Sequence, residues 1–316
     1  MINTHEQERA FSKNQGIDNQ IDFIRANFGA SKADYVRHKN IGGRSNEKGN
    51  SYEIFFAISR IATLVPQVFE NNLEVYVSNQ IPCFVDDLII EIPEKKSREN
   101  YQLKSSEKLS WDGGRHPLFK DFEDQHELNK KQEITCSKII LIVSNHDLHQ
   151  TMLTKKPEIL NGFCDVVLFI NYENLASFLD ADLDFQNAIS QLCPDENPSR
   201  ELLEGVANLI LAAWVSSSTK NCISLKELIL RTRNIYPTLI RQWGLIPEIR
   251  PLTQKILNSI AGFNYTIVRG FLSWNYYELQ FGRLPYDCCD QRFIKFQDTI
   301  EQKQPTTFDD LEVWLL

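Results

Sequence analysis

The chain contains the stretch Phe84-Val85-Asp86-Asp87-Leu88-Ile89-Ile90, followed a short way on by Tyr101-Gln102-Leu103-Lys104. Both stretches are apolar enough to be buried strands, yet they carry two aspartates and a lysine. An ionised side chain is stable on a core strand only when a partner charge or a metal ion accompanies it. A divalent cation held by aspartate and a main-chain carbonyl, with a lysine beside a water, would accommodate all of these groups. This is the chemistry of metal-dependent phosphodiester cleavage.

The neighbouring sequence predicts an α/β fold. Apolar residues at spacings of three and four indicate a helix over Ser51–Val65. The unbroken apolar runs Ile139–Val143 and Val166–Ile170 are typical of strands covered on both faces. The full set of expected elements comprises helices near 51–65 and 117–131 and strands near 73–78, 84–92, 100–105, 138–144 and 165–171.

The element order α-β-β-β-α-β-β, with acids on the second strand and Gln-x-Lys on the third, resembles the PD-(D/E)xK nuclease superfamily. Within it, the chain is most similar to the Mrr-like branch and to the endonuclease domains of bacterial anti-phage effectors, such as CBASS nucleases and the Lamassu nuclease subunit. The matching motifs are Gly49-Asn50-Ser51-Tyr52-Glu53, Asp86-Asp87-Leu88-Ile89-Ile90 and Tyr101-Gln102-Leu103-Lys104-Ser105-Ser106. The likeness covers roughly residues 42–171.

The resemblance implies a catalytic set of Glu53, Asp86, Asp87, Gln102 and Lys104, of which all but the lysine are candidate metal ligands. Adjacent residues on a strand face opposite sides, so only one of the two aspartates is expected to be the principal ligand, and the sequence leaves the choice open. Lys104 shares a strand face with Gln102 and would polarise the attacking water or stabilise the phosphate. Oxygen ligands with few charges favour Mg²⁺ or Mn²⁺ over zinc.

The net charge of −8 is unusual for an enzyme that acts on DNA, so its distribution matters. Two local excesses of basic residues, at 31–60 and 95–120, flank the acidic motif in sequence, and they are either solvated loops or phosphate-contacting edges. The residues expected to contact DNA are Arg44, Lys48, Lys96, Lys108 and Arg115. A weakly basic footprint on an acidic protein predicts that tight DNA capture needs oligomerisation or a partner subunit. The resemblance implies double-stranded DNA as the substrate, and a homo-oligomer or other defence-system subunits, such as an SMC-like ATPase, as partners.

Composition indicates a cytoplasmic protein with no membrane segment. No stretch reaches the length of a membrane span, and the N-terminus lacks a signal-peptide pattern. The seven cysteines have scattered spacing, which favours reduced thiols over a disulfide framework or a zinc site. His146 and His149 follow a predicted strand and are interpreted as ordinary surface residues.

Three regions are expected: an N-terminal helical extension over 1–40, the nuclease-like core over 41–192, and a mainly helical assembly or sensing domain with a β-pair over 198–316. The linker between the last two contains Pro194 and Pro198. In the C-terminal domain, Ser224-Leu225-Lys226-Glu227 is a capping box that begins a helix, and Gly270 separates two strand-like segments. A winged-helix module with Arg231, Arg233 and Arg241 on DNA is one alternative, and a docking domain with mostly buried aromatic residues is the other.

These expectations combine into one hypothesis, a metal-dependent DNA endonuclease that serves as the effector of an anti-phage system and is activated by a partner or by oligomerisation. Two alternatives remain open. The chain is either a catalytically silent scaffold that keeps the nuclease fold, or a conventional restriction endonuclease with a sequence-reading C-terminal domain.

Overall fold

A computed structural model describes residues 18–46, 51–106, 108–113, 116–218, 222–244 and 248–315. The chain divides into two compact units. Unit 1 comprises Met1–Ile61, Leu73–Phe178 and Leu211–Leu228, and unit 2 comprises Ala62–Asn72, Leu179–Ile210 and Ile229–Leu316. The chain therefore passes between the units several times, and the expected linker around Pro194 lies within unit 2.

Unit 1 is built on a mixed six-stranded sheet with the order β5-β4-β3-β2-β1-β6. Strands β3, β4 and β5 are parallel, whereas β1 pairs antiparallel with β2 and β6, and β2 pairs antiparallel with β3. The strand bounds are β1 Tyr76–Ser78, β2 Leu88–Ile92, β3 Ser97–Lys104, β4 Cys136–Val143, β5 Cys164–Leu168 and β6 Ile223–Ser224. The predicted α/β class is confirmed.

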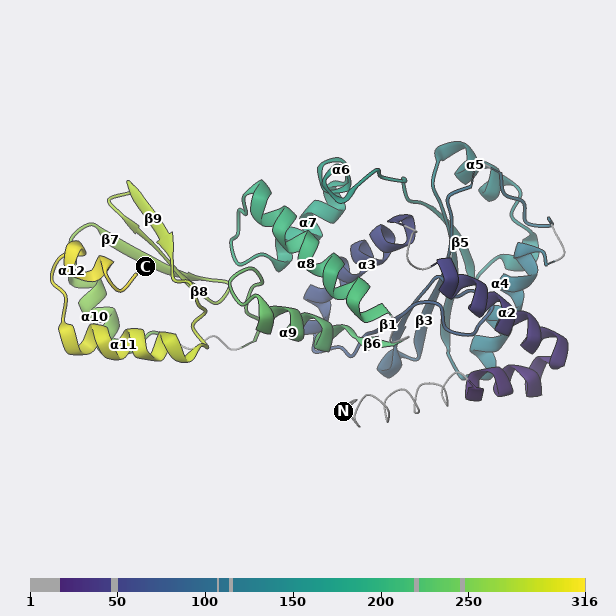
Figure 1. The fold of residues 1–316 in the computed structure, drawn as a ribbon, viewed down its shortest axis with the longest axis horizontal. Helices are drawn as coiled ribbons and strands as arrows, with labels where there is room; N and C mark the ends of the chain where they lie inside the picture. The colour runs from purple at the N-terminus through teal and green to yellow at the C-terminus, as the bar shows by residue number, and fades with distance from the viewer. Residues whose placement is uncertain are drawn as a thin grey trace. The chain divides into compact units, whose positions relative to one another are not determined.

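Helices cover both faces of this sheet (Figure 1). On one face, α2 and α4 lie side by side, joined by an ion pair from Lys32 to Asp124. On the other face, Phe56 of α3 packs against Tyr101 of β3. The helical bounds in this unit, including those shared with unit 2, are residues 18–28, α2 Ala30–Asn46, α3 Ser51–Glu70, α4 Leu118–Lys131, α5 His146–Thr154, α6 Leu175–Ala181, α8 Arg200–Ser218 and α9 Leu225–Ile235, with 3-10 turns η1 Pro93–Lys95 and η2 Glu158–Leu160.

The two apolar strand runs differ in burial. All of Ile139–Val143 in β4 is buried, as predicted for a strand covered on both faces. The same prediction is wrong for β5, where Cys164 and Val166 are buried but Val167 is 42% exposed. The reason is topological, because β5 is the edge strand of the sheet.

The strand expected over residues 84–92 begins only at Leu88. Residues 84–87 form a bend that precedes β2, so Asp86 and Asp87 do not lie on a strand. The expectation of a continuous strand is wrong for a specific reason: the N–H groups of Phe84 and Val85 donate to the Gln125 side chain. We call residues 84–87 the acid loop.

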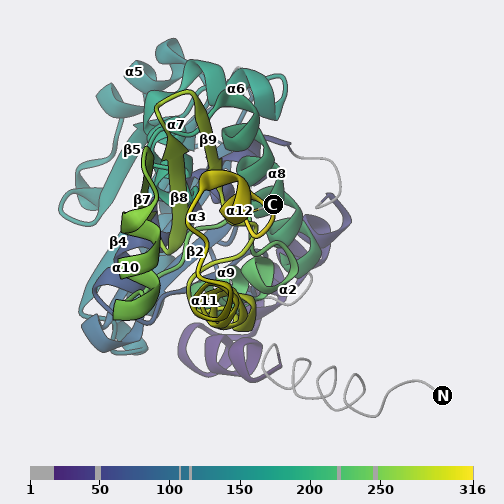
Figure 2. The same cartoon turned by 90° about the vertical axis from the view of Figure 1, so that its left-hand side faces the viewer.

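Unit 2 contains a second sheet, with the antiparallel order β7-β8-β9 (Figure 2). A two-residue turn at Arg269 and Gly270 joins β7 to β8, and both residues have positive φ, as a type I′ hairpin requires. This confirms the predicted β-pair and adds a third strand. The remaining bounds are α7 Leu183–Leu192, α10 Pro251–Ser259, β7 Phe263–Val268, β8 Phe271–Tyr276, β9 Gln280–Arg283, α11 Gln291–Lys303 and α12 Phe308–Glu312.

Residues of α10, α11, α12 and the sheet share one apolar core. Phe263 is buried in it, Trp274 and Tyr276 pack against it, and Tyr277 is exposed. The apolar C-terminal tail also packs there, through Phe308, Leu311 and Leu315. Arg233, a DNA contact in the winged-helix alternative, instead forms an ion pair of 2.6 Å with buried Asp287.

The segment that joins α7 to α8 is held firmly within unit 2. The Arg269 guanidinium donates to three main-chain carbonyls, those of Ser190, Cys193 and Asp195, at 2.6–3.0 Å. Arg283 pairs with the Asp195 carboxylate at 2.5 Å. The proline-containing stretch is therefore an ordered connection and not a free hinge.

Among the described residues, one helix, α3, is long and apolar enough to cross a membrane by length and composition. More than half of its apolar window is buried inside the protein, as in a core helix, so the resemblance to a membrane span is weak.

Candidate active site

Asp86 is the most buried ionisable group of the acid loop, with 2% of its surface exposed. Its main-chain carbonyl accepts a 2.7 Å hydrogen bond from the N–H of Gln80. Its Oδ1 atom lies 3.2 Å from the ammonium of Lys39 but has no hydrogen-bond partner among the described residues. A buried carboxylate oxygen without a hydrogen bond is under-solvated and is a ready ligand for a cation.

The Asp87 carboxylate contacts other groups than the Asp86 carboxylate does. Its Oδ2 atom accepts a 2.7 Å hydrogen bond from the main-chain N–H of Leu103 and another from the side-chain amide of Gln102. Asp87 therefore fixes the end of β3 and the orientation of Gln102. Of the roles that the sequence left open, the structure gives Asp87 the role of a strand cap and gives Asp86 a partner cation.

Gln102 and Lys104 lie two residues apart on β3 and hence on one face of the sheet, together with Asn100. Gln102 is 2% exposed, and its Oε1 atom lies 3.1 Å from the Lys39 ammonium. Lys104 is half-buried at the end of the strand, beside Val143 of β4. The structure thus brings Asp86, Gln102 and Lys104 to one end of β3.

Lys39, which no sequence motif marks as a site residue, lies at the centre of the site. Its ammonium donates to the main-chain carbonyl of Phe84 at 2.5 Å and also contacts Gln102 and Asp86. It lies 3.9 Å from Asp121 of α4, whose Oδ2 atom accepts a 2.7 Å hydrogen bond from the Tyr35 hydroxyl. The N-terminal helices, expected as an extension outside the core, thus supply a charged group to the site.

The charges in this cluster perturb one another. Burial raises the pKa of Asp86 to about 6, against the opposing effects of the Lys39 and Lys104 ammonium groups. Burial alone would lower the pKa of Lys39, but the carboxylates of Asp86, Asp121 and Asp87 together raise it. Burial likewise raises the pKa of Asp121. Lys39 is accordingly a firmly held cation, and Asp86 is a carboxylate that lacks solvation.

The donor set of the site fits a hard divalent cation. Asp86 Oδ1 supplies charge and has no hydrogen bond of its own, and the Gln102 amide oxygen and the Phe84 carbonyl supply neutral oxygen ligands. In the described part of the chain, no group of three or more His, Cys, Asp or Glu side chains has metal-binding geometry. A metal held by Asp86, Gln102 and the Phe84 carbonyl would have one carboxylate ligand, which predicts weak binding.

Glu53 lies in the first turn of α3 and is half-buried. This helix covers the face of β3 that carries Tyr101, opposite to the face that carries Gln102 and Lys104. Glu53 therefore approaches from the other side of the sheet.

The residues expected to contact DNA are placed unevenly. Lys96 is exposed and precedes β3, so it lies at the opposite end of that strand from Lys104. Lys108 is exposed and follows the site end of β3. Lys48 and Arg115 lie outside the described residues, as does the side chain of Arg44.

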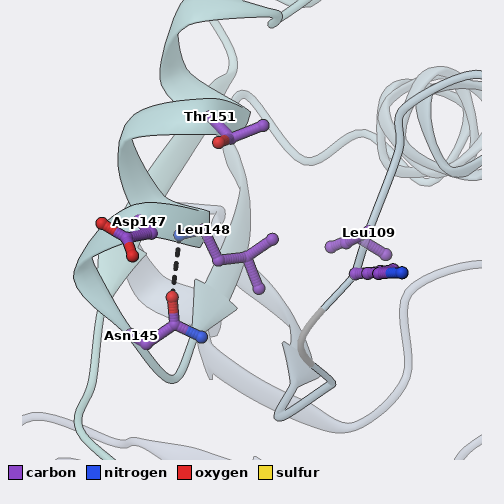
Figure 3. A pocket seen from close by; sticks show the side chains of 6 residues that line it. Leu109, Asn145, Asp147, Leu148 and Thr151 are labelled. Atoms are coloured by element: carbon purple, nitrogen blue, oxygen red, sulfur yellow. Dashed lines mark hydrogen bonds between the residues drawn. The ribbon is translucent and has the colours of Figure 1, made fainter.

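Lys108 lines a pocket of about 400 Å³ at the start of α5 (Figure 3). The α5 side of this pocket is formed by Asn145, Asp147, Leu148 and Thr151, with Leu109 across from them. Asn145 caps the helix by accepting a 2.8 Å hydrogen bond from the Leu148 N–H. Nearby, a ring nitrogen of His149 lies 3.2 Å from the carbonyl of Val166, which is a structural contact.

A buried network of amide side chains holds the acid loop in place by hydrogen bonds. Gln125 of α4 accepts from the N–H groups of Phe84 and Val85, and Asn100 donates to the Val85 carbonyl at 3.0 Å. Asn129 connects the two, since it accepts from Gln125 and donates to Asn100. A sequence signal for this network exists: Asp121, Gln125 and Asn129 recur every four residues on a helix face that also carries buried apolar residues.

No family model, no curated protein and no solved structure matches the chain. The resemblance to PD-(D/E)xK nucleases therefore rests on the sequence motifs alone.

Proposed function

We propose that the protein is a metal-dependent DNA endonuclease that uses Mg²⁺ or Mn²⁺. The observation that carries the proposal is the buried Asp86 Oδ1, which has no hydrogen-bond partner in the described chain and lies in one cluster with the Gln102 oxygen. Lys104 follows on the same face of β3. The Mrr-like nuclease core is the fold that this arrangement favours, and it belongs to the proposal.

Each residue has a role that follows from its chemistry. Asp86 would bind the metal through charge, and Gln102 would add a neutral oxygen ligand. When bound, the metal would activate water for in-line attack on phosphorus. The Lys104 ammonium would stabilise the negative charge that develops on the phosphate oxygens. Asp87 holds Gln102 in the orientation that points its oxygen towards the site.

Double-stranded DNA as substrate and anti-phage defence as context come from the resemblance alone. A net charge of −8 supports dependence on partners, because an acidic protein gains little from non-specific attraction to phosphates. We infer that a homo-oligomer or further defence subunits complete DNA capture in the cytoplasm.

A second function, that of a catalytically silent scaffold, is favoured by one observation. The Lys39 ammonium already neutralises Asp86 and contacts Gln102 and the Phe84 carbonyl. In a scaffold, this internal ion pair would be the permanent state of the site.

Cleavage of supercoiled plasmid by wild type and Lys104→Ala, with Mg²⁺, Mn²⁺ or EDTA, tests the proposal. We expect metal-dependent cutting by the wild type and a loss of about 100-fold or more in Lys104→Ala. Lys130→Ala is the matched control, because Lys130 is exposed on α4, lies outside both basic stretches and pairs with Glu127. Full activity in a folded Lys104→Ala protein would refute the mechanism.

A further inference from the structure

The Lys39 ammonium contacts the same oxygens that would bind the proposed metal ion. It lies 2.5 Å from the Phe84 carbonyl, 3.1 Å from the Gln102 amide oxygen and 3.2 Å from Asp86 Oδ1. The Phe84 carbonyl and the Gln102 amide oxygen accept hydrogen bonds from the ammonium, and Asp86 Oδ1 is its ion-pair partner. One carboxylate and two neutral carbonyl-type oxygens are also the ligands that Mg²⁺ and Mn²⁺ select.

Helix α2 delivers this ammonium from outside the sheet. Ala33 and Val36 pack in a buried cluster with Phe84 and Ile89, which docks the helix against the acid loop. On a neighbouring stripe of α2, Lys32 pairs with Asp124 and Tyr35 bonds to Asp121, so the helix is also tied to α4. Lys39 is one turn beyond Tyr35 and therefore reaches the site whenever α2 is docked.

A second carboxylate, that of Asp121, lies near the Lys39 ammonium in addition to the carboxylate of Asp86. Asp121 Oδ2 is 3.9 Å from the ammonium and already accepts a hydrogen bond from Tyr35. A small rotation of the lysine side chain would exchange Asp86 for Asp121 without leaving the ammonium unpaired. The cluster thus offers Lys39 two positions, one on the proposed metal ligands and one beside them.

We propose that Lys39 is an internal competitor of the divalent metal, and that metal binds only when the Lys39 ammonium moves from Asp86 to Asp121. This inference rests on the proposed function, because it assigns a regulatory role to the same site. Two cations cannot share the oxygens of Asp86 and Gln102, since like charges a few ångströms apart repel strongly in a buried site. A partner that shifts α2 would therefore activate the site, and a docked α2 keeps metal affinity low.

Mn²⁺ binding measured by isothermal titration calorimetry tests the competition without relying on activity. We expect Lys39→Met to bind Mn²⁺ at least tenfold more tightly than the wild type, and Asp86→Asn in the Lys39→Met background to abolish the gain. Lys130→Met is the matched control, since Lys130 is exposed on α4 and pairs there with Glu127, away from the contacts that dock α2. It should leave the Mn²⁺ affinity within twofold of the wild type.

Removal of Lys39 leaves Asp86 and Asp121 without their cation and so threatens folding. Lys39→Met combined with Asp121→Asn removes one of the two uncompensated charges, and it should show the same gain in Mn²⁺ affinity. Circular dichroism establishes that each variant is folded before titration.

A measurement on the unaltered protein gives an independent readout. Reductive methylation followed by mass spectrometry reports how accessible each lysine amine is. We expect Lys39 to be protected in EDTA and to be labelled several-fold faster with Mn²⁺, while Lys95 is labelled equally in both.

The outcomes separate the two proposals. If the wild type binds Mn²⁺ and cuts DNA, but Lys39→Met binds no more tightly and Lys39 labelling does not change, the competition is refuted and the nuclease stands. If neither wild type nor Lys39→Met binds Mn²⁺ and no metal-dependent cutting occurs, the proposed function falls and the competition falls with it.

Discussion

The main-chain N–H of Leu103 donates a 2.7 Å hydrogen bond to Oδ2 of Asp87, which ties the acid loop to the end of β3. The Gln102 amide donates to the same oxygen. One carboxylate oxygen thereby fixes both the strand and the side chain that faces Lys39.

Replacement of Asp87 by Ala should destabilise the fold. The substitution leaves a partly buried main-chain donor and an amide without their acceptor, which costs about 1–3 kcal/mol in free energy of unfolding. Asp87→Asn keeps an acceptor oxygen and should lose clearly less. Urea denaturation of both variants measures the difference, and equal losses would contradict the capping role.

The two aspartates should also differ in cleavage. Asp86 carries the oxygen that lacks a hydrogen bond in the described chain, whereas Asp87 is occupied by Leu103 and Gln102. We expect Asp86→Asn to lower the rate of Mg²⁺-dependent plasmid cleavage by about 100-fold or more, as for removal of a principal charge-stabilising group. Asp87→Asn should stay within about tenfold of the wild type by the same comparison. If Asp87→Asn slows cleavage more than Asp86→Asn does, Asp87 is the principal metal ligand.

Gln125→Leu should destabilise the acid loop. Its side-chain oxygen accepts from the N–H groups of Phe84 at 2.9 Å and Val85 at 3.1 Å, and the leucine leaves both donors buried and unpaired. Each unsatisfied donor costs about 1–3 kcal/mol. Glu127→Ala on the same helix breaks an exposed pair with Lys130 and should cost about 1 kcal/mol or less. Chemical denaturation of the two variants should therefore give clearly different midpoints.

Stability should fall at acidic pH in part through His126. The imidazole stacks flat on Phe163, with ring centroids 3.9 Å apart, and burial lowers the pKa of His126. As the pH falls through the ordinary histidine pKa of about 6.5, the unfolded chain takes up a proton more readily than the folded chain, so the free energy of unfolding decreases. Urea midpoints at pH 7.5 and 5.5 should differ less in His126→Phe than in the wild type. An undiminished difference in the variant would rule out this contribution.

Thiol reactivity should divide the seven cysteines into two groups. Cys136, Cys222 and Cys289 are exposed, and the other four are buried. Because thiolate attack requires access, a disulfide reagent should titrate three thiols in the native protein and seven in denaturant. Fewer than seven in denaturant without reductant would indicate a disulfide.

The predicted order of elements holds from Ser51 through β4, but the expected direct step to the next strand is wrong, because β4 and β5 are parallel and α5 and η2 connect them. The helix at Ser51 and the strand that carries Gln102 and Lys104 appear as expected, because local patterns determine both. The alternation of β3 also placed Gln102 and Lys104 on one face correctly.

Long-range contacts account for what the sequence did not predict. Lys39 reaches Gln102 across 63 residues, and no local pattern links the two. The acid loop looked like a strand because Phe84 and Val85 are apolar, but a side chain from α4 takes the hydrogen bonds that a ladder would have used. The stripe of Asp121, Gln125 and Asn129 was visible in the sequence and is the signal that would have revealed the buried network.

The hydrogen bonds from the acid loop to Gln125 have a consequence for biosynthesis. Gln125 stands 41 residues after Phe84, so the loop cannot settle on a ribosome until α4 has emerged from the exit tunnel. We expect a nascent chain long enough to bring the acid loop but not α4 out of the tunnel to expose the loop to proteases, and a chain long enough to bring out α4 as well to protect it. A cell that makes this protein would then carry no assembled candidate site on its incomplete chains.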